Sequence, residues 1–263
     1  AAVAKKHDIP LIVDNTFGAG GYLFAPLKHG ANIVVESATK WIGGHGSSLG
    51  GVIVDGGNFD WSNGKFPEFT EPSAGYHGLK YYEVLGAASF MAKVRIEGLR
   101  DLGASLSPFN AFQIIQGLET LAIRIKKHSE NALELAKWLQ KCTEVAWVNY
   151  PGLISSKYYD LAQEYLPEGQ SGIVTFGLKG GYEAAKKVAD ETQFFSLLAN
   201  IGDTKSLIIH PASTTHQQLS EEQQITTGVT KDLIRLSVGL EDIEDLKADL
   251  EGVFEKLPVQ NLV

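Results

Sequence analysis

The stretch ANIVVESATKWIGGHG, residues 31–46, joins an apolar run to a lysine in a glycine-rich loop. The β-branched residues of its first half form a short apolar run, which is typical of a strand buried in a parallel sheet. Ser37 and Thr39 then precede Lys40, and a tryptophan and three glycines follow within the same stretch. A solvated surface lysine gains nothing from such neighbours, so the pattern indicates that Lys40 is placed for chemistry.

Two more strands are predicted around this stretch. PLIVD at residues 10–14 is a short apolar run that ends in Asp14, and GGVIVDGG at residues 50–57 is bounded by glycines. The connection between the first two strands is long enough for a crossover with a short helical piece, which favours a parallel pair. Asp14 and Lys40 would then lie just past the carboxyl ends of neighbouring strands, at the edge where an open α/β sheet binds ligands.

The remaining pattern predicts a second, smaller domain. Residues 56–78 are polar, aromatic and rich in proline and glycine, which indicates a long irregular loop of functional or interfacial use. Helical periodicity covers residues 80–98 and 108–141. After them, helices are expected at 181–190, 219–225 and 242–257, between strands at 172–178, 206–210 and 233–239. This alternation predicts an α+β domain over residues 131–263 behind an α/β domain over residues 1–130, with the boundary inside the long helix.

The composition bounds the functions that the chain can have. Of its 263 residues, 44% are hydrophobic and 21% are charged, an ordinary globular composition. The formal net charge of -8 argues against binding to nucleic acid or to an anionic membrane surface. Cys142 is the only cysteine of the chain, which excludes an internal disulfide framework and fits a reducing, cytoplasmic compartment.

The first residues read as the end of a helix already under way. The chain begins AAVAKKHD without an initiator methionine, and it shows no signal peptide and no apolar run near twenty residues. We expect the chain to be the C-terminal part of a longer protein.

Several common cofactor and metal motifs are absent from the sequence. The glycines near Lys40 do not follow the dinucleotide-binding pattern, and no Walker A sequence occurs. The seven histidines include no H-E-x-x-H motif, and paired cysteines are missing. The sequence therefore predicts no metal site.

One hydrolase motif is present in the sequence as a residue pattern. Gly46–Gly50 reads G-x-S-x-G around Ser48, and Asp203 and His210 follow in the order of an α/β-hydrolase triad. The nucleophile of such enzymes must stand between a strand and a helix, whereas here the preceding strand ends well before the serine and another strand follows it. A serine hydrolase using Ser48 therefore stays a distant alternative.

Asp14 and Lys40 together form the parts of a pyridoxal phosphate site. A lysine forms a Schiff base with the cofactor aldehyde, and a carboxylate keeps the pyridine nitrogen protonated so that the ring accepts carbanion charge. Hydroxyls and backbone amides such as those around Ser37 and Thr39 hold a phosphate. Each residue alone has a plainer interpretation, because Asp14 before an asparagine suits a turn and an isolated lysine is more often solvated. Their order and their placement at strand ends favour the cofactor site.

The stretch DNTFGAGGYLFAPLKHGANIVVESATKWIGGHG at residues 14–46 closely resembles the Cys/Met-metabolism family of pyridoxal phosphate enzymes. The likeness continues through GDTKSLIIHPASTTH at residues 202–216 and IRLSVGLED at residues 234–242, so it covers nearly the whole chain. The resemblance implies the α/β fold of the fold type I transferases. Residues 1–130 would form part of the mostly parallel sheet of the cofactor-binding large domain, and residues 131–263 the small C-terminal α+β domain.

The resemblance also implies a role for each residue at the predicted strand ends. Lys40 would form the Schiff base and would also move protons on the substrate. Asp14 would pair with the pyridine nitrogen of pyridoxal 5'-phosphate. Ser37 and Thr39 would help to hold the phosphate group.

Two residues of the second domain would bind the substrate carboxylate by the same resemblance. Arg235 would grip this group as a planar fork, and Ser206 would contact it as well. Arg235 can also be interpreted as a paired structural ion. An unpaired charge in the otherwise apolar strand LIRLSV would be expensive, however, which favours a ligand-binding role.

Within the family, the chain is most similar to the O-acetylhomoserine sulfhydrylases. The similarity rests on residues 71–78, 100–124 and 228–241. It implies a cytoplasmic enzyme of methionine biosynthesis that replaces the acetate of O-acetyl-L-homoserine by sulfide, giving L-homocysteine. Methionine γ-lyase and cystathionine γ-synthase or lyase chemistry on the same scaffold stay alternatives, because fold does not settle function. A non-catalytic remnant kept for assembly is a further alternative.

The resemblance implies that part of the cofactor site lies outside this chain. The family's N-terminal half supplies most of the large sheet, the glycine-rich phosphate turn and the aromatic ring that stacks on the cofactor. A tyrosine and an arginine reach in from the neighbouring subunit. We therefore expect the chain to act with its own N-terminal half, in a homotetramer that is a dimer of dimers.

Overall fold

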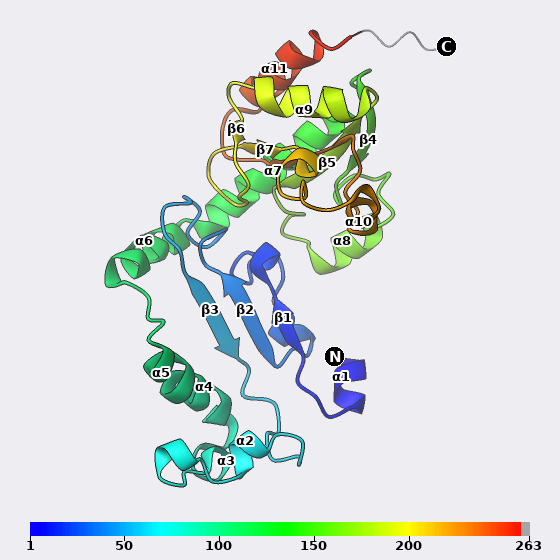
Figure 1. The fold of residues 1–263 in the computed structure, drawn as a ribbon. Coiled ribbons are helices and arrows are strands. Elements are labelled where there is room, and N and C mark those ends of the chain that lie inside the picture. The colour runs from blue at the N-terminus through cyan, green and yellow to red at the C-terminus, as the bar shows by residue number, and fades with distance from the viewer. Residues whose placement is uncertain (259–263) are drawn as a thin grey trace.

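The computed structural model describes residues 1–258. Figure 1 shows a three-stranded sheet near the N-terminus and a five-stranded sheet farther along the chain. The strands are β1 (Ile12–Asp14), β2 (Ile33–Ser37), β3 (Gly51–Asp55), β4 (Val145–Asn149), β5 (Ile173–Leu178), β6 (Ser196–Leu197), β7 (Leu207–Ile209) and β8 (Leu233–Ser237). The longer helices are α6 (Pro108–Glu119), α7 (Leu121–Leu139), α9 (Gly181–Glu191) and α11 (Ile243–Phe254). The shorter helical pieces are α1 (Ala2–Lys6), η1 (Thr16–Gly18), η2 (Pro26–His29), α2 (Pro67–Thr70), η3 (Ala74–Tyr76), α3 (Tyr81–Leu85), η4 (Gly86–Ala88), α4 (Ser89–Lys93), η5 (Val94–Leu99), α5 (Arg100–Leu102), α8 (Tyr159–Tyr165), η6 (Pro211–Ser213) and α10 (Glu221–Thr226).

The three-stranded sheet is mixed. β1 and β2 run parallel, with Asp14 paired to Val35, as the sequence predicts for a pair joined by a crossover. β2 and β3 run antiparallel, with Ser37 paired to Gly51. The third strand departs from a parallel arrangement because residues 38–50 form turns and bends without a helix, so no crossover is available. Asp14 and Ser37, which end β1 and β2, lie at the same edge of this sheet.

The segment after β3 is more ordered than the irregular loop that the sequence predicts. It contains α2 and η3, and Trp61 lies at the centre of an aromatic cluster with Phe59, Phe66, Phe69 and Phe90. The helical stretch that follows is divided into short pieces. Its first break lies at the end of α3, where the next residue is a glycine with a φ of 52°, and it continues into the π-helix η5.

The second long helical stretch divides at Thr120 into α6 and α7. The first turns of α7 pack against residues 38–50, the lysine loop, where Trp41 belongs to one hydrophobic cluster with Ile125 of the helix. From Ala132 onward the same helix belongs to the core of the five-stranded sheet. This change of packing partner agrees with a boundary inside the helix, and the limits 1–130 and 131–263 stay a prediction.

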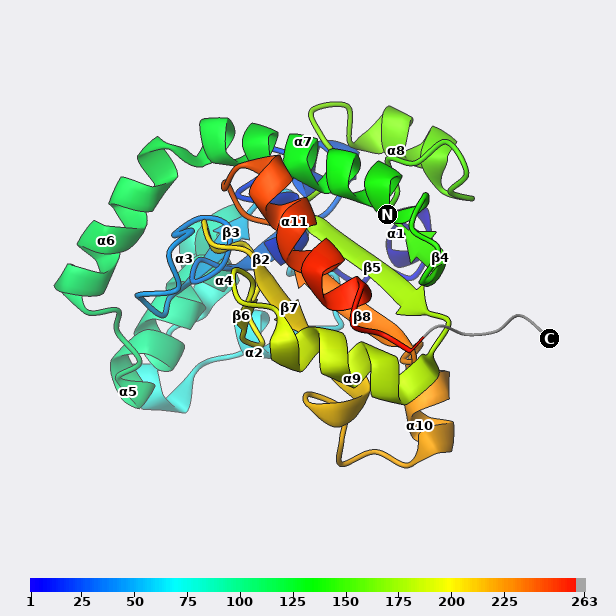
Figure 2. The same cartoon turned by 90° about the horizontal axis from the view of Figure 1, so that it is seen from above.

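The five-stranded sheet has the order β4-β5-β8-β7-β6. Its neighbouring strands run antiparallel except for β6 and β7, which run parallel. Helices α7, α9 and α11 lie over one face of the sheet and share its core (Figure 2). Within residues 1–258, none of the helices has the length and apolar character needed to cross a lipid bilayer.

Candidate functional site

Asp14 ends β1 with its carboxylate held by the following turn. Its Oδ1 accepts hydrogen bonds from the Thr16 hydroxyl at 2.7 Å and from the Thr16 amide at 2.9 Å. These two donors lower the pKa of Asp14 below its usual value, and burial opposes them only weakly. The structure therefore keeps an ionised carboxylate at the edge of the sheet.

Thr16 also joins the ends of the two parallel strands. Its hydroxyl oxygen accepts a hydrogen bond from the Ser37 amide at 2.9 Å. Asp14, Thr16 and Ser37 line one cavity of about 720 Å³, with other walls from β3 and from residues 104–106. A cavity of this size is large enough for a small-molecule cofactor. Sequence reasoning misses Thr16, although it belongs to the same DNT motif as the aspartate.

A second carboxylate supports this turn from the neighbouring strand. Glu36 accepts hydrogen bonds from the side-chain amide of Asn15 and from the backbone amide of Gly20, both at 2.8 Å. Burial raises the pKa of Glu36, and the nearby charge of Asp14 adds to that effect. The two carboxylates thus have opposite environments, and the one with the lowered pKa is the one suited to an ion pair.

Thr39 joins the two ends of the lysine loop. Its hydroxyl accepts a hydrogen bond from the Gly50 amide at 3.0 Å and donates one to the Gly50 carbonyl at 3.3 Å. These contacts hold the two ends of the loop together. Contact of this hydroxyl with a phosphate stays a prediction.

Lys40 and Arg235 meet at one residue that sequence reasoning misses. The Lys40 Nζ donates to Oδ1 of Asn200 at 2.5 Å, and the Arg235 Nη2 donates to the Asn200 carbonyl at 3.3 Å. Asn200 stands two residues before the motif GDTKSLIIH, and this closeness is the only signal for it in the sequence. The structure thus brings the candidate lysine of the first sheet and the candidate arginine of β8 to one point.

The surroundings of Arg235 suit a ligand-binding cation. Arg235 is half-buried, and the other four residues of β8 are buried. Burial lowers the pKa of its guanidinium. Within residues 1–258 it forms no salt bridge with a carboxylate. Because a buried charge without a partner is costly, this geometry agrees with the predicted binding of a carboxylate ligand.

Ser206 does not join this group. It is completely buried, and its hydroxyl donates to Glu241 at 2.8 Å and accepts from the Gly239 amide at 2.8 Å. Its backbone amide also donates to Glu241, at 2.6 Å. The hydroxyl is engaged inside the small domain, so the structure does not support its predicted contact with the substrate carboxylate. Asn200 is the residue that lies beside Arg235.

The residues of the hydrolase alternative do not form a triad. The Ser48 hydroxyl donates to the side chain of Gln113. His210 is buried, and its ring nitrogens contact the Ser213 hydroxyl and the Lys231 carbonyl, each at 2.8 Å. A serine nucleophile needs a base within hydrogen-bond reach, and here both groups have other partners.

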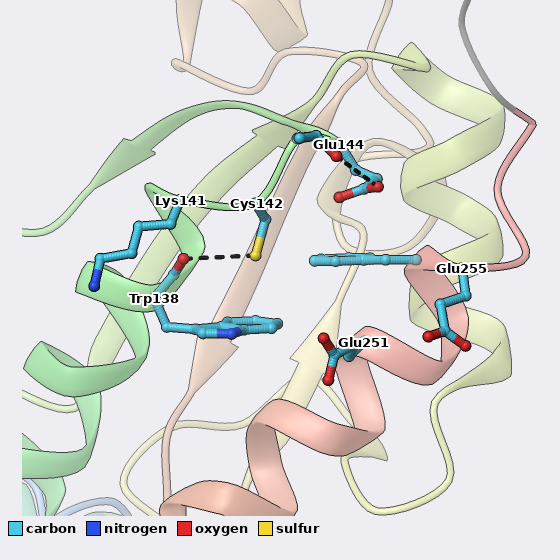
Figure 3. A pocket seen from close by; sticks show the side chains of 8 residues that line it. Trp138, Lys141, Cys142, Glu144, Glu251 and Glu255 are labelled. Carbon is cyan, nitrogen blue, oxygen red and sulfur yellow. Dashed lines mark hydrogen bonds between the residues drawn. The ribbon is translucent and has the colours of Figure 1, made fainter.

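A separate pocket lies where the end of α7 meets α11 (Figure 3). Its volume is about 310 Å³, and Trp138, Cys142 and Phe254 are among the residues that line it. The rings of Trp138 and Phe254 stack there with centroids 6.0 Å apart. None of the predicted site residues lines this pocket, so it is not part of the candidate site.

Comparison with known proteins points to one family. The family described as Cys/Met metabolism PLP-dependent enzyme matches residues 1–255. The chain is 55% identical to an O-acetyl-L-homoserine sulfhydrylase of Leptospira meyeri, over 97% of this chain and 60% of that protein. It is 53% identical to O-acetyl-L-homoserine sulfhydrylase 1 of Thermus thermophilus, over 95% of this chain and 60% of that protein.

A solved structure has the same fold. A crystal structure from Campylobacter jejuni that contains N'-pyridoxyl-lysine-5'-monophosphate matches with a TM-score of 0.92 and 46% sequence identity. The match covers 97% of this chain and 61% of that one. The chain thus spans about three fifths of the length of the curated relatives it matches.

Proposed function

The chain belongs to the Cys/Met-metabolism family of pyridoxal-phosphate-dependent enzymes, and from that premise we propose that it carries the lysine-bearing part of an O-acetyl-L-homoserine sulfhydrylase. The reaction would replace the acetate on Cγ of O-acetyl-L-homoserine by sulfide and release L-homocysteine and acetate. The observation that carries the proposal is the meeting of Lys40 and Arg235 at Asn200. The names of the Leptospira meyeri and Thermus thermophilus relatives support the choice of substrate.

The residues at the carboxyl edge of the first sheet fit pyridoxal phosphate. Asp14 is ionised and would pair with the ring nitrogen. Ser37 lines the same cavity and would contact the phosphate, as would Thr39, which follows two residues later in the chain. Lys40 carries the amine that would hold the cofactor aldehyde. When bound, the cofactor supplies a ring that accepts the electron pair left on the substrate carbon.

The protein's own side chains divide the remaining work. Arg235 would bind the substrate carboxylate, because a guanidinium matches a carboxylate with two parallel donors. This contact would orient the α-carbon toward Lys40, whose nitrogen would take and return protons there. Thr16 would keep Asp14 charged and in place. Fold type I architecture, with a large and a small domain on either side of this site, belongs to the same proposal.

Uncovered apolar surface supports the proposal that further segments complete the site. Ile12 and Ile53 of the three-stranded sheet are 53% and 43% exposed, although sheets with parallel strands normally bury both faces. On α6, Phe109 and Phe112 are 65% and 55% exposed. An N-terminal half would cover the sheet, and a second subunit of a dimer of dimers would cover α6.

Product analysis of the full-length protein tests this function. With O-acetyl-L-homoserine, sulfide and pyridoxal phosphate, we expect homocysteine and acetate in equal amounts. With L-methionine alone we expect no methanethiol. Methanethiol from methionine would instead indicate a γ-lyase, and cystathionine from cysteine and an activated homoserine would indicate a γ-synthase. A serine hydrolase would show no visible absorption from the cofactor.

A further inference from the structure

The lysine loop and one segment of the small domain contact each other at both ends. At one end, the Lys40 Nζ donates to the side-chain oxygen of Asn200 at 2.5 Å. At the other end, the Thr204 amide donates to the Gly44 carbonyl at 2.8 Å. The two five-residue segments that begin at Lys40 and Asn200 therefore lie side by side, although they are far apart in the sequence.

The middle of the small-domain segment is fixed as well. Gly202, with a φ of 73°, lies so close to Trp41 that a Cβ would stand 2.7 Å from a ring carbon. Its amide donates to the Ser237 hydroxyl at 3.0 Å, and the carbonyl of Asn200 accepts from Arg235. The backbone that carries Asn200 is thus bonded to β8 and packed against the residue after Lys40, so the acceptor is carried on fixed backbone.

A fixed acceptor matters for a lysine more than for most side chains. The ammonium has three donors at the end of a flexible four-carbon stem, so its position is undefined unless a partner holds it. The structure places the Asn200 side-chain oxygen at hydrogen-bond distance from Lys40, and among residues 1–258 this oxygen accepts from Lys40 alone.

We propose that Asn200 is a positioning residue that holds the Lys40 amine whenever that amine is not bonded to the cofactor. The inference rests on the proposed function, in which Lys40 must leave the cofactor and then exchange a proton with the substrate α-carbon. In that exchange the amine takes the proton, and the electron pair of the C–H bond stays on the substrate. Asn200 neither gains nor loses a proton and acts only by orienting the nitrogen.

Chemical labelling measures this contact without using enzyme activity. The full-length protein, freed of pyridoxal phosphate, is pulse-labelled with acetic anhydride, and Lys40 acetylation is measured by peptide mass spectrometry against the exposed Lys205. In Asn200→Ala we expect Lys40 to react about tenfold faster, since a hydrogen bond from a charged donor is lost. Asn200→Asp keeps an acceptor oxygen and pairs its negative charge with the ammonium, so Lys40 should react no faster than in the wild type. Thr204→Ala alters the same segment without touching this acceptor and should leave the Lys40 rate unchanged.

Kinetics separate positioning of the lysine from binding of the substrate. In Asn200→Ala we expect kcat to fall about tenfold or more while KM for O-acetyl-L-homoserine changes less than about threefold. An unchanged Lys40 labelling rate, or a raised KM with a normal kcat, would overturn the inference. If the wild type neither binds pyridoxal phosphate nor forms homocysteine, the proposed function fails, and the labelling contrast still decides whether Asn200 holds Lys40.

Discussion

The Thr16 hydroxyl lies 2.7 Å from Oδ1 of Asp14, the same oxygen that accepts the Thr16 amide at 2.9 Å. Because this hydroxyl also accepts a hydrogen bond from the Ser37 amide, one threonine holds the carboxylate against the end of the neighbouring strand. The charge of Asp14 is thereby supported from within its own turn, so that substitutions can remove the charge and its support separately.

Replacing Asp14 by asparagine should lower turnover far more than cofactor retention. The phosphate contacts would remain, but the ring nitrogen would lose its anionic partner. We expect kcat to fall about a hundredfold or more, which corresponds to about 2.7 kcal/mol of barrier. Thr16→Val keeps the amide donor and should lose about tenfold in kcat, with the acid limb of its pH profile moved upward as the pKa of Asp14 rises. Steady-state kinetics and cofactor titration measure both variants, and near-normal turnover in Asp14→Asn would remove Asp14 from the site.

Replacing Arg235 by lysine should weaken substrate binding while leaving the cofactor spectrum intact. Lysine keeps the charge but loses the planar fork that matches a carboxylate. We expect KM for O-acetyl-L-homoserine to rise about tenfold or more, by the loss of a charge-assisted pair of hydrogen bonds. An unchanged KM would leave Arg235 as a structural residue.

His128 should make the folded protein less stable in mild acid. It is completely buried, and burial lowers its pKa from 6.5 to about 4. Between these two values His128 is protonated in the unfolded chain and neutral in the folded chain. The folded state therefore loses stability as the pH falls from 6.5 towards 4. Between pH 6.5 and pH 5 the loss should be about 1.5 kcal/mol in the free energy of unfolding.

Urea unfolding of the full-length protein at the two pH values checks this expectation. His128→Gln should flatten the pH dependence, because its side chain does not titrate. His7→Gln, which changes an exposed histidine, serves as the matched control for the substitution itself. An equal pH dependence in wild type and His128→Gln would contradict the prediction.

Gly44 should tolerate alanine much less than Gly57 does. Both glycines have positive φ, 71° and 62°, so alanine strains the backbone at either position. A Cβ on Gly44 would also overlap the buried guanidinium of Arg124, whereas nothing lies within 4 Å at Gly57. We expect Gly57→Ala to cost about 1 kcal/mol and Gly44→Ala about 3 kcal/mol or more, measured by denaturant unfolding. Equal costs in free energy at the two positions would show that the Arg124 side chain moves aside.

Cys142 should react slowly with alkylating reagents. Burial raises the pKa of its thiol to about 11, the charge of Glu144 adds to this, and the thiol donates to the Trp138 carbonyl at 3.5 Å (Figure 3). At pH 8 we expect iodoacetamide to label it about a hundredfold more slowly than free cysteine, because the thiolate is the reacting species. Glu144→Gln should raise the rate. Labelling at the rate of free cysteine would show that the thiol is not held in this environment.

Much of the candidate site could be predicted from the sequence because its signals are local. A short β-branched run specifies a strand, and the residue that follows it marks the sheet edge, which placed Asp14, Ser37 and Lys40. The α/β class and the family follow from motifs contained in single stretches, and the family match over residues 1–255 confirms the resemblance. The antiparallel direction of β3 was harder to predict from the sequence, because it depends on whether the connection between β2 and β3 forms a helix.

Only the tertiary structure decided which residues of the two domains meet. Asn200 and Lys40 are 160 positions apart, and no periodicity or spacing relates them. Ser206, by contrast, stands in a recognisable motif but turns inward to Glu241. The physical reason is that a sequence pattern determines which face of an element is apolar, whereas the pairing of polar side chains across domains follows from how α7 and the two sheets pack.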